Sequence, residues 1–123
     1  MKPLIHSKNS AKKYGGVWQD YINIHNFFDQ TKAHVPEAKH RAFLHNTLGI
    51  SLCEQIFGTI VTNSEGKEIS VRSIAEDHVL EDLGWIPTLK ECSDHMELTD
   101  WMLGSRRKEI IKITDPNFVN KIK

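Results

Sequence analysis

The stretch VRSIAEDHVLEDLG, residues 71–84, has the pattern that decides the fold. Its apolar residues recur at the three- and four-residue spacing of a helix, and Gly84 follows at a position typical of a helix end. We therefore predict a helix over about residues 73–83. Placed around that helix, His78 and Asp82 fall one turn apart within the apolar arc, although both side chains are polar.

A β-hairpin is predicted immediately before this helix. Two β-branched runs, residues 59–62 and 68–71, flank a turn that contains Gly66. The other elements that we predict are helices, over about residues 17–30, 36–57 and 88–103. The sequence therefore predicts a mainly α fold, a compact bundle of about four helices with one short hairpin between the second and the third.

Length and composition predict a single soluble domain over residues 1–123. Hydrophobic residues make up 39% and charged residues 26% of the chain, as in an ordinary globular protein. Residues 1–16 are expected to form an irregular arm, and residues 105–123 a basic tail. No apolar run approaches the roughly 18–20 residues that cross a bilayer, and the start lacks the apolar core of a signal peptide. We expect no membrane partner and a cytoplasmic location.

Charge and residue usage narrow the function classes. Sixteen basic residues balance sixteen acidic ones, whereas a general duplex nucleic-acid binder usually carries a basic excess, so that class is disfavoured. Cys53 and Cys92 have no CxxC spacing and are interpreted as packing thiols. Seven histidines are more than double the average share, and histidine is the usual residue for metal binding and proton transfer. The sequence is compatible with a homo-oligomer.

The predicted helix over residues 17–30 repeats the pattern of the one over residues 73–83. His25 and Asp29 lie one turn apart and fall in the middle of its apolar arc. A buried aspartate is costly unless it is paired, hydrogen-bonded or bound to a metal. Both helices therefore turn a histidine and an aspartate toward the core.

The predicted helix over residues 36–57 adds a third inward histidine. His45 and Arg41 lie within its buried stripe, whereas His40 falls on its polar face. Gly49 interrupts this helix, which suggests a close helix–helix contact at that point.

Three histidines from three helices predict one shared site. We predict His25, His45, His78 and Asp82 as metal ligands, with Asp82, Asp29 and Arg41 as catalytic groups. Imidazole and carboxylate suit a divalent metal such as zinc, iron or manganese. Such a set serves metal-assisted phosphoester hydrolysis. A purely structural hydrogen-bonded network is the alternative for the same residues.

A small anionic or phosphate-containing ligand is the partner that such chemistry implies. Residues 6–16 combine hydroxyls, basic groups and glycines just before a predicted helix, an arrangement that can hold an anion. Lys12 and Lys13 from this arm, or Arg41, would then receive it. A solvated arm is the alternative.

Four segments resemble an uncharacterised family of small proteins from bacteria and their phages. They are SAKKYGG at 10–16, DYINIH at 20–25, HRAFLH at 40–45 and VRSIAEDHVLEDLGWIPT at 71–88. The resemblance covers roughly residues 6–96. It implies a one-domain protein of unknown function and supplies no activity.

A topological likeness to HD-type phosphohydrolases is weaker. Those helical enzymes bind metal through a helix-borne histidine, a His-Asp doublet and a later aspartate. His25, His45 and Asp82 could take similar parts, but neither His40 nor His45 is followed by aspartate. The doublet is therefore missing.

Two functions remain at this point. The first is a metal-dependent hydrolase that acts on a phosphoester or nucleotide. The alternative is a non-catalytic phage or bacterial accessory protein that binds a partner, with the buried histidines and aspartates holding its fold together.

Overall fold

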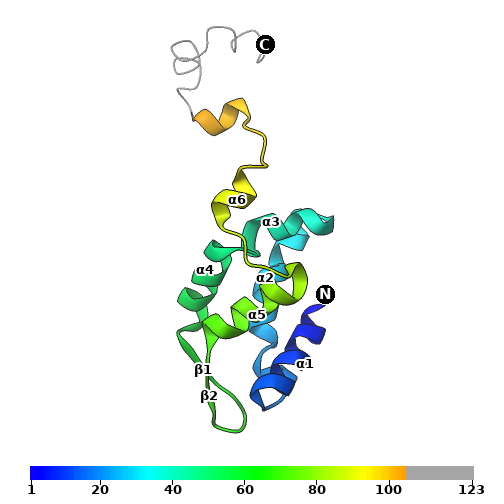
Figure 1. The fold of residues 1–123 in the computed structure, drawn as a ribbon, viewed down its shortest axis with the longest axis vertical. Helices are drawn as coiled ribbons and strands as arrows, with labels where there is room; N and C mark the ends of the chain where they lie inside the picture. The colour runs from blue at the N-terminus through cyan, green and yellow to red at the C-terminus, as the bar shows by residue number, and fades with distance from the viewer. Residues whose placement is uncertain (105–123) are drawn as a thin grey trace.

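The computed structural model describes residues 1–104 of the chain (Figure 1). The α-helices in this part are α1 (Pro3–Tyr14), α2 (Ile22–Asp29), α3 (Arg41–Leu44), α4 (Thr47–Phe57), α5 (Val71–Leu83) and α6 (Leu89–Ser93). Single-turn 3-10 helices are η1 (Trp18–Asp20), η2 (Gln30–Ala33), η3 (Glu37–His40) and η4 (Asp100–Leu103). The strands are β1 (Ile60–Thr62) and β2 (Glu68–Ser70). The predicted basic tail lies outside the described residues.

The predicted hairpin is confirmed and leads directly into α5. Strands β1 and β2 pair antiparallel, with Val61 opposite Ile69. The Asn63 side chain closes the turn, because its Oδ1 accepts hydrogen bonds from the backbone N–H groups of Glu65 and Lys67, each at 3.0 Å. The mainly α fold with one hairpin between two helices, α4 and α5, is therefore as predicted.

Helix α5 lies at the centre of the described fold, in contact with α1, α2 and α4 (Figure 1). Its first half is apolar on the inner face and packs into the hydrophobic core. The fully or almost fully buried members of that core are Tyr21, Ile24, Phe28, Ile50, Cys53, Val71, Ile74, Ala75 and Val79. Its second half carries His78 and Asp82 away from the hairpin, toward the polar cluster described below.

The expected irregular arm is wrong, because residues 3–14 form α1. Pro3 occupies the first turn, where its missing N–H costs nothing. The buried residues of α1 are His6, Ser7 and Ser10, which are all polar. A search for an apolar stripe overlooks such a helix. The inner face of α1 packs against α2 and α5 and is not exposed to solvent.

The single helix predicted over residues 36–57 is also wrong, because the chain turns between α3 and α4. Asn46 has an extended backbone at the start of α4, and its side chain accepts a hydrogen bond from the Gly49 N–H at 3.1 Å. A Cβ on Gly49 would lie 1.6 Å from the carbonyl oxygen of Leu44. Glycine is therefore required at this turn. The close contact at Gly49 is with the backbone of Leu44, five residues earlier in the chain.

The last predicted helix begins where expected and ends early. Thr88 Oγ1 accepts a hydrogen bond from the N–H of Glu91 at 3.1 Å and so caps the first turn of this helix. Helix α6 then ends at Ser93 rather than near residue 103. Within residues 1–104 no helix has both the length and the apolar character needed to span a bilayer.

Candidate metal centre

Four donor atoms from α2, α5 and the segment after α3 converge in the interior. They are Asp29 Oδ1, His45 Nε2, His78 Nε2 and Asp82 Oδ2, and all lie within 4.8 Å of one another. His45 Nε2 lies 2.9 Å from Asp82 Oδ2 and 3.2 Å from His78 Nε2. Asp29 Oδ1 lies 3.6 Å from His45 Nε2 and 3.7 Å from His78 Nε2. The His–Asp spacing seen in α5 is a local contact, with His78 Nε2 3.4 Å from Asp82 Oδ2.

These separations match those between the ligands of one divalent ion. Nitrogen and oxygen ligands lie about 2.0–2.2 Å from zinc, so tetrahedral neighbours are about 3.3–3.6 Å apart. The rings of His45 and His78 are tilted by 57° with centroids 5.0 Å apart, so they are not stacked and their Nε2 atoms can face a common point. The side chains of both histidines are fully buried, and that of Asp82 is 1% exposed. Two imidazoles and two carboxylates in such a place form a suitable set for zinc, iron or manganese.

His25 does not belong to this set of four residues, but it contacts one of them, His78. Its Nδ1 is hydrogen-bonded to His78 Nδ1 at 2.9 Å, and its Nε2 to Ser10 Oγ at 2.7 Å. A histidine that binds a metal through Nε2 carries its proton on Nδ1 and donates it to a neighbour. His25 is placed to accept that proton from His78 and to donate its own Nε2–H to Ser10. The structure thus brings His25, His45 and His78 together, with His25 behind His78.

His6 is a member of the cluster that the sequence interpretation missed. It is fully buried, stacks on His78 with ring centroids 3.8 Å apart, and places its Nε2 3.2 Å from Asp82 Oδ1. A donor atom from each of His6, His25 and His78 also lies within 4.8 Å of the others. Their rings are stacked nearly parallel, so their in-plane lone pairs do not converge. His6 is therefore better suited to hold Asp82 in place than to ligate an ion beside His25.

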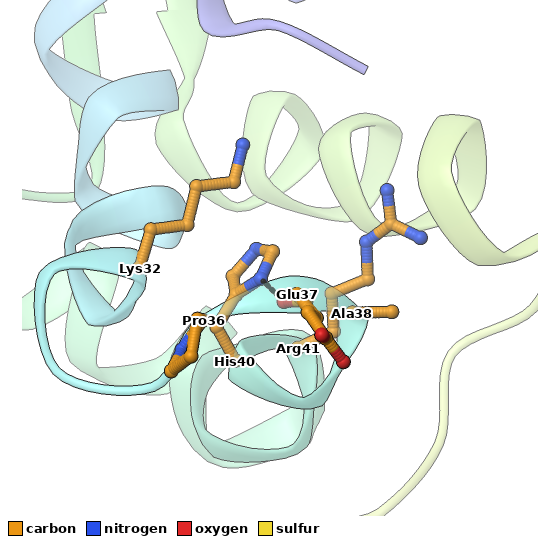
Figure 2. A pocket seen from close by; sticks show the side chains of 6 residues that line it. All are labelled: Lys32, Pro36, Glu37, Ala38, His40 and Arg41. Atoms are coloured by element: carbon orange, nitrogen blue, oxygen red, sulfur yellow. Dashed lines mark hydrogen bonds between the residues drawn. The ribbon is translucent and has the colours of Figure 1, made fainter.

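A pocket of about 480 Å³ has Lys32, Arg41 and Glu37 as its charged lining residues, and its two cationic residues contact the carboxylates of the site (Figure 2). Lys32 Nζ lies 3.6 Å from Asp29 Oδ2, and Arg41 Nη2 lies 3.6 Å from Asp82 Oδ1. Figure 2 shows both cationic ends on the same side of the pocket, with the His40 ring between them. The pocket therefore meets the site at its two carboxylates. Lys13, expected to receive an anion, is instead paired with Asp77 at 2.9 Å.

His40 is the clearest correction among the histidines. The sequence pattern predicts His40 on a polar, solvent-facing side of its helix, yet its side chain is only 3% exposed. Residues 37–57 do not form one helix, because η3 and α3 are separated from α4 by His45 and Asn46, so the predicted polar face does not extend to His40. Both His40 and His45 are buried. Among the described residues, the buried side-chain atoms that have no hydrogen-bond partner are Asp29 Oδ2, His40 Nε2, Arg41 Nε, His45 Nδ1 and Thr99 Oγ1. Four of these five belong to the site or its pocket.

Burial and charge act in opposite directions on the ionisable groups of the cluster. Burial, and then the neighbouring imidazoles, lower the pKa of His25 to about 3, so this ring is neutral. Burial also lowers the pKa of His45. For His78 burial acts downward, but the carboxylates of Asp29 and Asp82 outweigh it and raise its pKa.

The two carboxylates are held in their ionised form. Burial alone would raise the pKa of Asp29, but the hydrogen bond from His78 and the nearby positive charges lower it to about 2. Burial likewise opposes ionisation of Asp82, whereas hydrogen bonds from His45, His6 and His78 lower its pKa far below the ordinary range. The site therefore presents two negative charges to any ion that enters it.

Fold and site together define a small helical domain built around a buried cluster of histidines and aspartates. The chain belongs to DUF6915, a family of domains of unknown function, whose model matches residues 1–102. No curated protein and no solved structure matches the chain. Membership of an uncharacterised family is thus confirmed, and the bacterial or phage origin stays a prediction.

Proposed function

We propose that this domain is a metal-dependent hydrolase that acts on a phosphoester, with one divalent ion held by Asp29, His45, His78 and Asp82. The convergence of these four donors within 4.8 Å of one another is the observation that carries the proposal. In a purely structural network the two carboxylates would be expected to pair fully with donors. Here Asp29 Oδ2 accepts no hydrogen bond, and its charged neighbour is Lys32, which lies 3.6 Å away and lines the pocket.

A bound divalent ion supplies two things to phosphoester hydrolysis: it polarises a phosphoryl oxygen and lowers the pKa of a bound water. The chain supplies the rest. Lys32 and Arg41 line the pocket and would hold the phosphate oxygens, and a pocket of about 480 Å³ is in the range of small-molecule sites. The free Oδ2 of Asp29 is placed to accept a proton from the attacking water. Water adds to phosphorus, the P–O ester bond breaks, and the leaving oxygen takes a proton.

The remaining members of the cluster support the ligands in this proposal. His25 and Ser10 fix the proton of His78 on Nδ1, which leaves Nε2 free for the ion. His6 holds the Oδ1 atom of Asp82 and leaves Oδ2 for the ion. Such outer partners orient ligands and raise their basicity.

Metal analysis with matched variants tests the proposal. The stripped protein is reloaded with Zn²⁺, Fe²⁺ or Mn²⁺, and bound metal is measured together with hydrolysis of p-nitrophenyl phosphate and bis(p-nitrophenyl) phosphate. We expect wild type and His34→Gln, a change at an exposed histidine, to bind metal and to hydrolyse one of the two esters. Asp82→Asn and His45→Gln should lose both properties while keeping the helical circular dichroism signal. Wild-type protein that binds no divalent ion would overturn the metal site, and bound metal without hydrolysis of either ester would overturn the activity.

A further inference from the structure

His40 has the orientation of a metal ligand although it lies outside the four-residue set. Its Nδ1 lies 2.6 Å from the carbonyl oxygen of Glu37. A carbonyl oxygen only accepts hydrogen bonds, so Nδ1 must carry the proton and donate it. In the neutral ring Nε2 then holds a lone pair. Histidines that bind metals typically donate their other ring N–H to a backbone carbonyl or carboxylate in this way.

The Nε2 atom of His40 has no hydrogen-bond partner and faces a carboxylate. It lies 3.6 Å from Asp29 Oδ1, and the His40 side chain is 97% buried. A lone pair opposite the carboxylate oxygen Oδ1 is repulsive. A cation between the imidazole and the carboxylate would satisfy both residues. A distance of 3.6 Å is the separation expected of two ligands on one ion, at about 2.0–2.2 Å from each.

We propose that His40 Nε2 and Asp29 hold a second divalent ion on the pocket side of the first. This rests on the proposed function, because Asp29 would then bridge the two ions. His40 does not belong to the four residues whose donor atoms all lie within 4.8 Å of one another, so it cannot simply join them around one ion. His40, Lys32 and Arg41 line the same pocket (Figure 2), so the remaining ligand positions of this ion would be directed toward that pocket.

The second ion defines the class of substrate more closely. Two ions that share a carboxylate lie about 3.5–4 Å apart and together contact the attacking and leaving oxygens of a phosphoester. Lys32 and Arg41 flank the same space and add positive charge for the non-bridging oxygens. The pocket is thus suited to a phosphate group carried by a small molecule, with the phosphate toward His40 and the remainder toward the pocket mouth.

Metal stoichiometry separates this inference from the proposed function. Metal-free protein is titrated with Mn²⁺, and bound ions per chain are counted after desalting. We expect two ions in wild type and in His34→Gln, and one in His40→Gln. Two ions at bridging distance also give an exchange-coupled electron paramagnetic resonance spectrum in wild type, and His40→Gln should give that of isolated Mn²⁺. The wild-type spectrum tests the inference even where the variant folds poorly.

Three results would overturn the inference. A single uncoupled ion in wild type, unchanged in His40→Gln, removes the second ion and leaves the four-residue site standing. Weaker binding of inorganic phosphate in His40→Gln with an unchanged ion count would mean that His40 contacts the anion directly. Wild-type protein without any bound Mn²⁺ would overturn the proposed function itself, and the second ion with it.

Discussion

The two halves of helix α5 pack against two different kinds of interior. Toward the hairpin, Val71, Ile74 and Ala75 are completely buried among apolar side chains. Toward the other end, His78 is equally buried but lies among imidazoles and carboxylates. The apolar half needs nothing further, whereas the polar half contains ionised carboxylates and donor atoms without partners. Under the proposed function, a bound ion would stabilise the polar half of α5 and leave the apolar half unaffected.

Truncation in the apolar half should give the largest loss of stability and no dependence on metal. Ile74→Ala removes a side chain with no exposed surface, and such substitutions cost about 2–5 kcal/mol through lost burial and the cavity left behind. Urea unfolding of metal-free and metal-loaded protein measures the change in free energy. We expect the same loss in both. A loss that differs by more than about 1 kcal/mol would show that the two halves are coupled.

Substitutions in the polar half of α5 should change stability by an amount that depends on bound metal. Wild-type protein at a metal concentration of one hundred times Kd should gain about 2.7 kcal/mol over the metal-free form, because the ion binds the folded state alone. Asp82→Asn removes one ligand, so this gain should disappear. The remaining cost should come from the weakened hydrogen bonds that His45, His6 and the N-terminal amine make to this side chain. Urea unfolding of metal-free and metal-loaded protein measures both the gain from metal and the cost of the substitution. An equal cost for Asp82→Asn with and without metal would favour the structural network and the accessory-protein alternative.

The sequence predicted those buried polar residues that interrupt the apolar stripe of a helix. His25 with Asp29 and His78 with Asp82 stand out because a helix with an apolar stripe surrounds each pair. The hairpin was predictable because β-branched residues flank a glycine-containing turn. These signals are local, and local signals are what a single sequence carries.

The rest depended on contacts between distant segments. The buried residues of helix α1 are all polar and only Ala11 and Tyr14 of this helix pack against the apolar core, so its apolar stripe is weak, although Pro3 and the spacing of His6 and Ser10 could have indicated the helix. His40 was misplaced because α3 ends at Leu44 and α4 begins after Asn46, so residues 37–44 do not continue the helical phase of α4. The ion pair of Lys32 with Asp29, in contrast, joins residues three apart in the chain and could have been predicted from helical spacing.

A smaller effect, on metal affinity, is expected for His25, which contacts a ligand but not the ion. His25→Gln removes the group that receives the Nδ1 proton of His78. Loss of such a partner typically weakens metal binding 10–100-fold, with the number of bound ions unchanged. Competition with a chelator of known affinity measures the change, and Asn26→Gln on the exposed side of α2 is the matched control. If His25 were itself a ligand, as predicted from the sequence, the variant would lose an ion or change the absorption spectrum of bound Co²⁺.

The smallest effect concerns a polar contact that is complete without metal. Asp20 Oδ2 accepts hydrogen bonds from the Val17 N–H, the Ser64 N–H and the Ser64 hydroxyl at 2.9, 3.1 and 2.9 Å, and so ties η1 to the hairpin turn. These backbone hydrogen bonds, from Val17 and then Ser64, lower the pKa of Asp20 below its ordinary 3.8. The lowered pKa stabilises the fold above the unfolded value and ceases to do so as pH falls through the folded value.

Asp20→Asn should therefore be slightly less stable than wild type at pH 7, and the difference should shrink as the pH is lowered below about 4. Urea unfolding across this pH range measures it, with and without metal. Because Asp20 touches no member of the buried cluster, its difference should be the same in both forms. A metal-dependent difference at Asp20 would mean that the ion acts on the whole fold, and the contrast between the two halves of α5 would then lose its meaning.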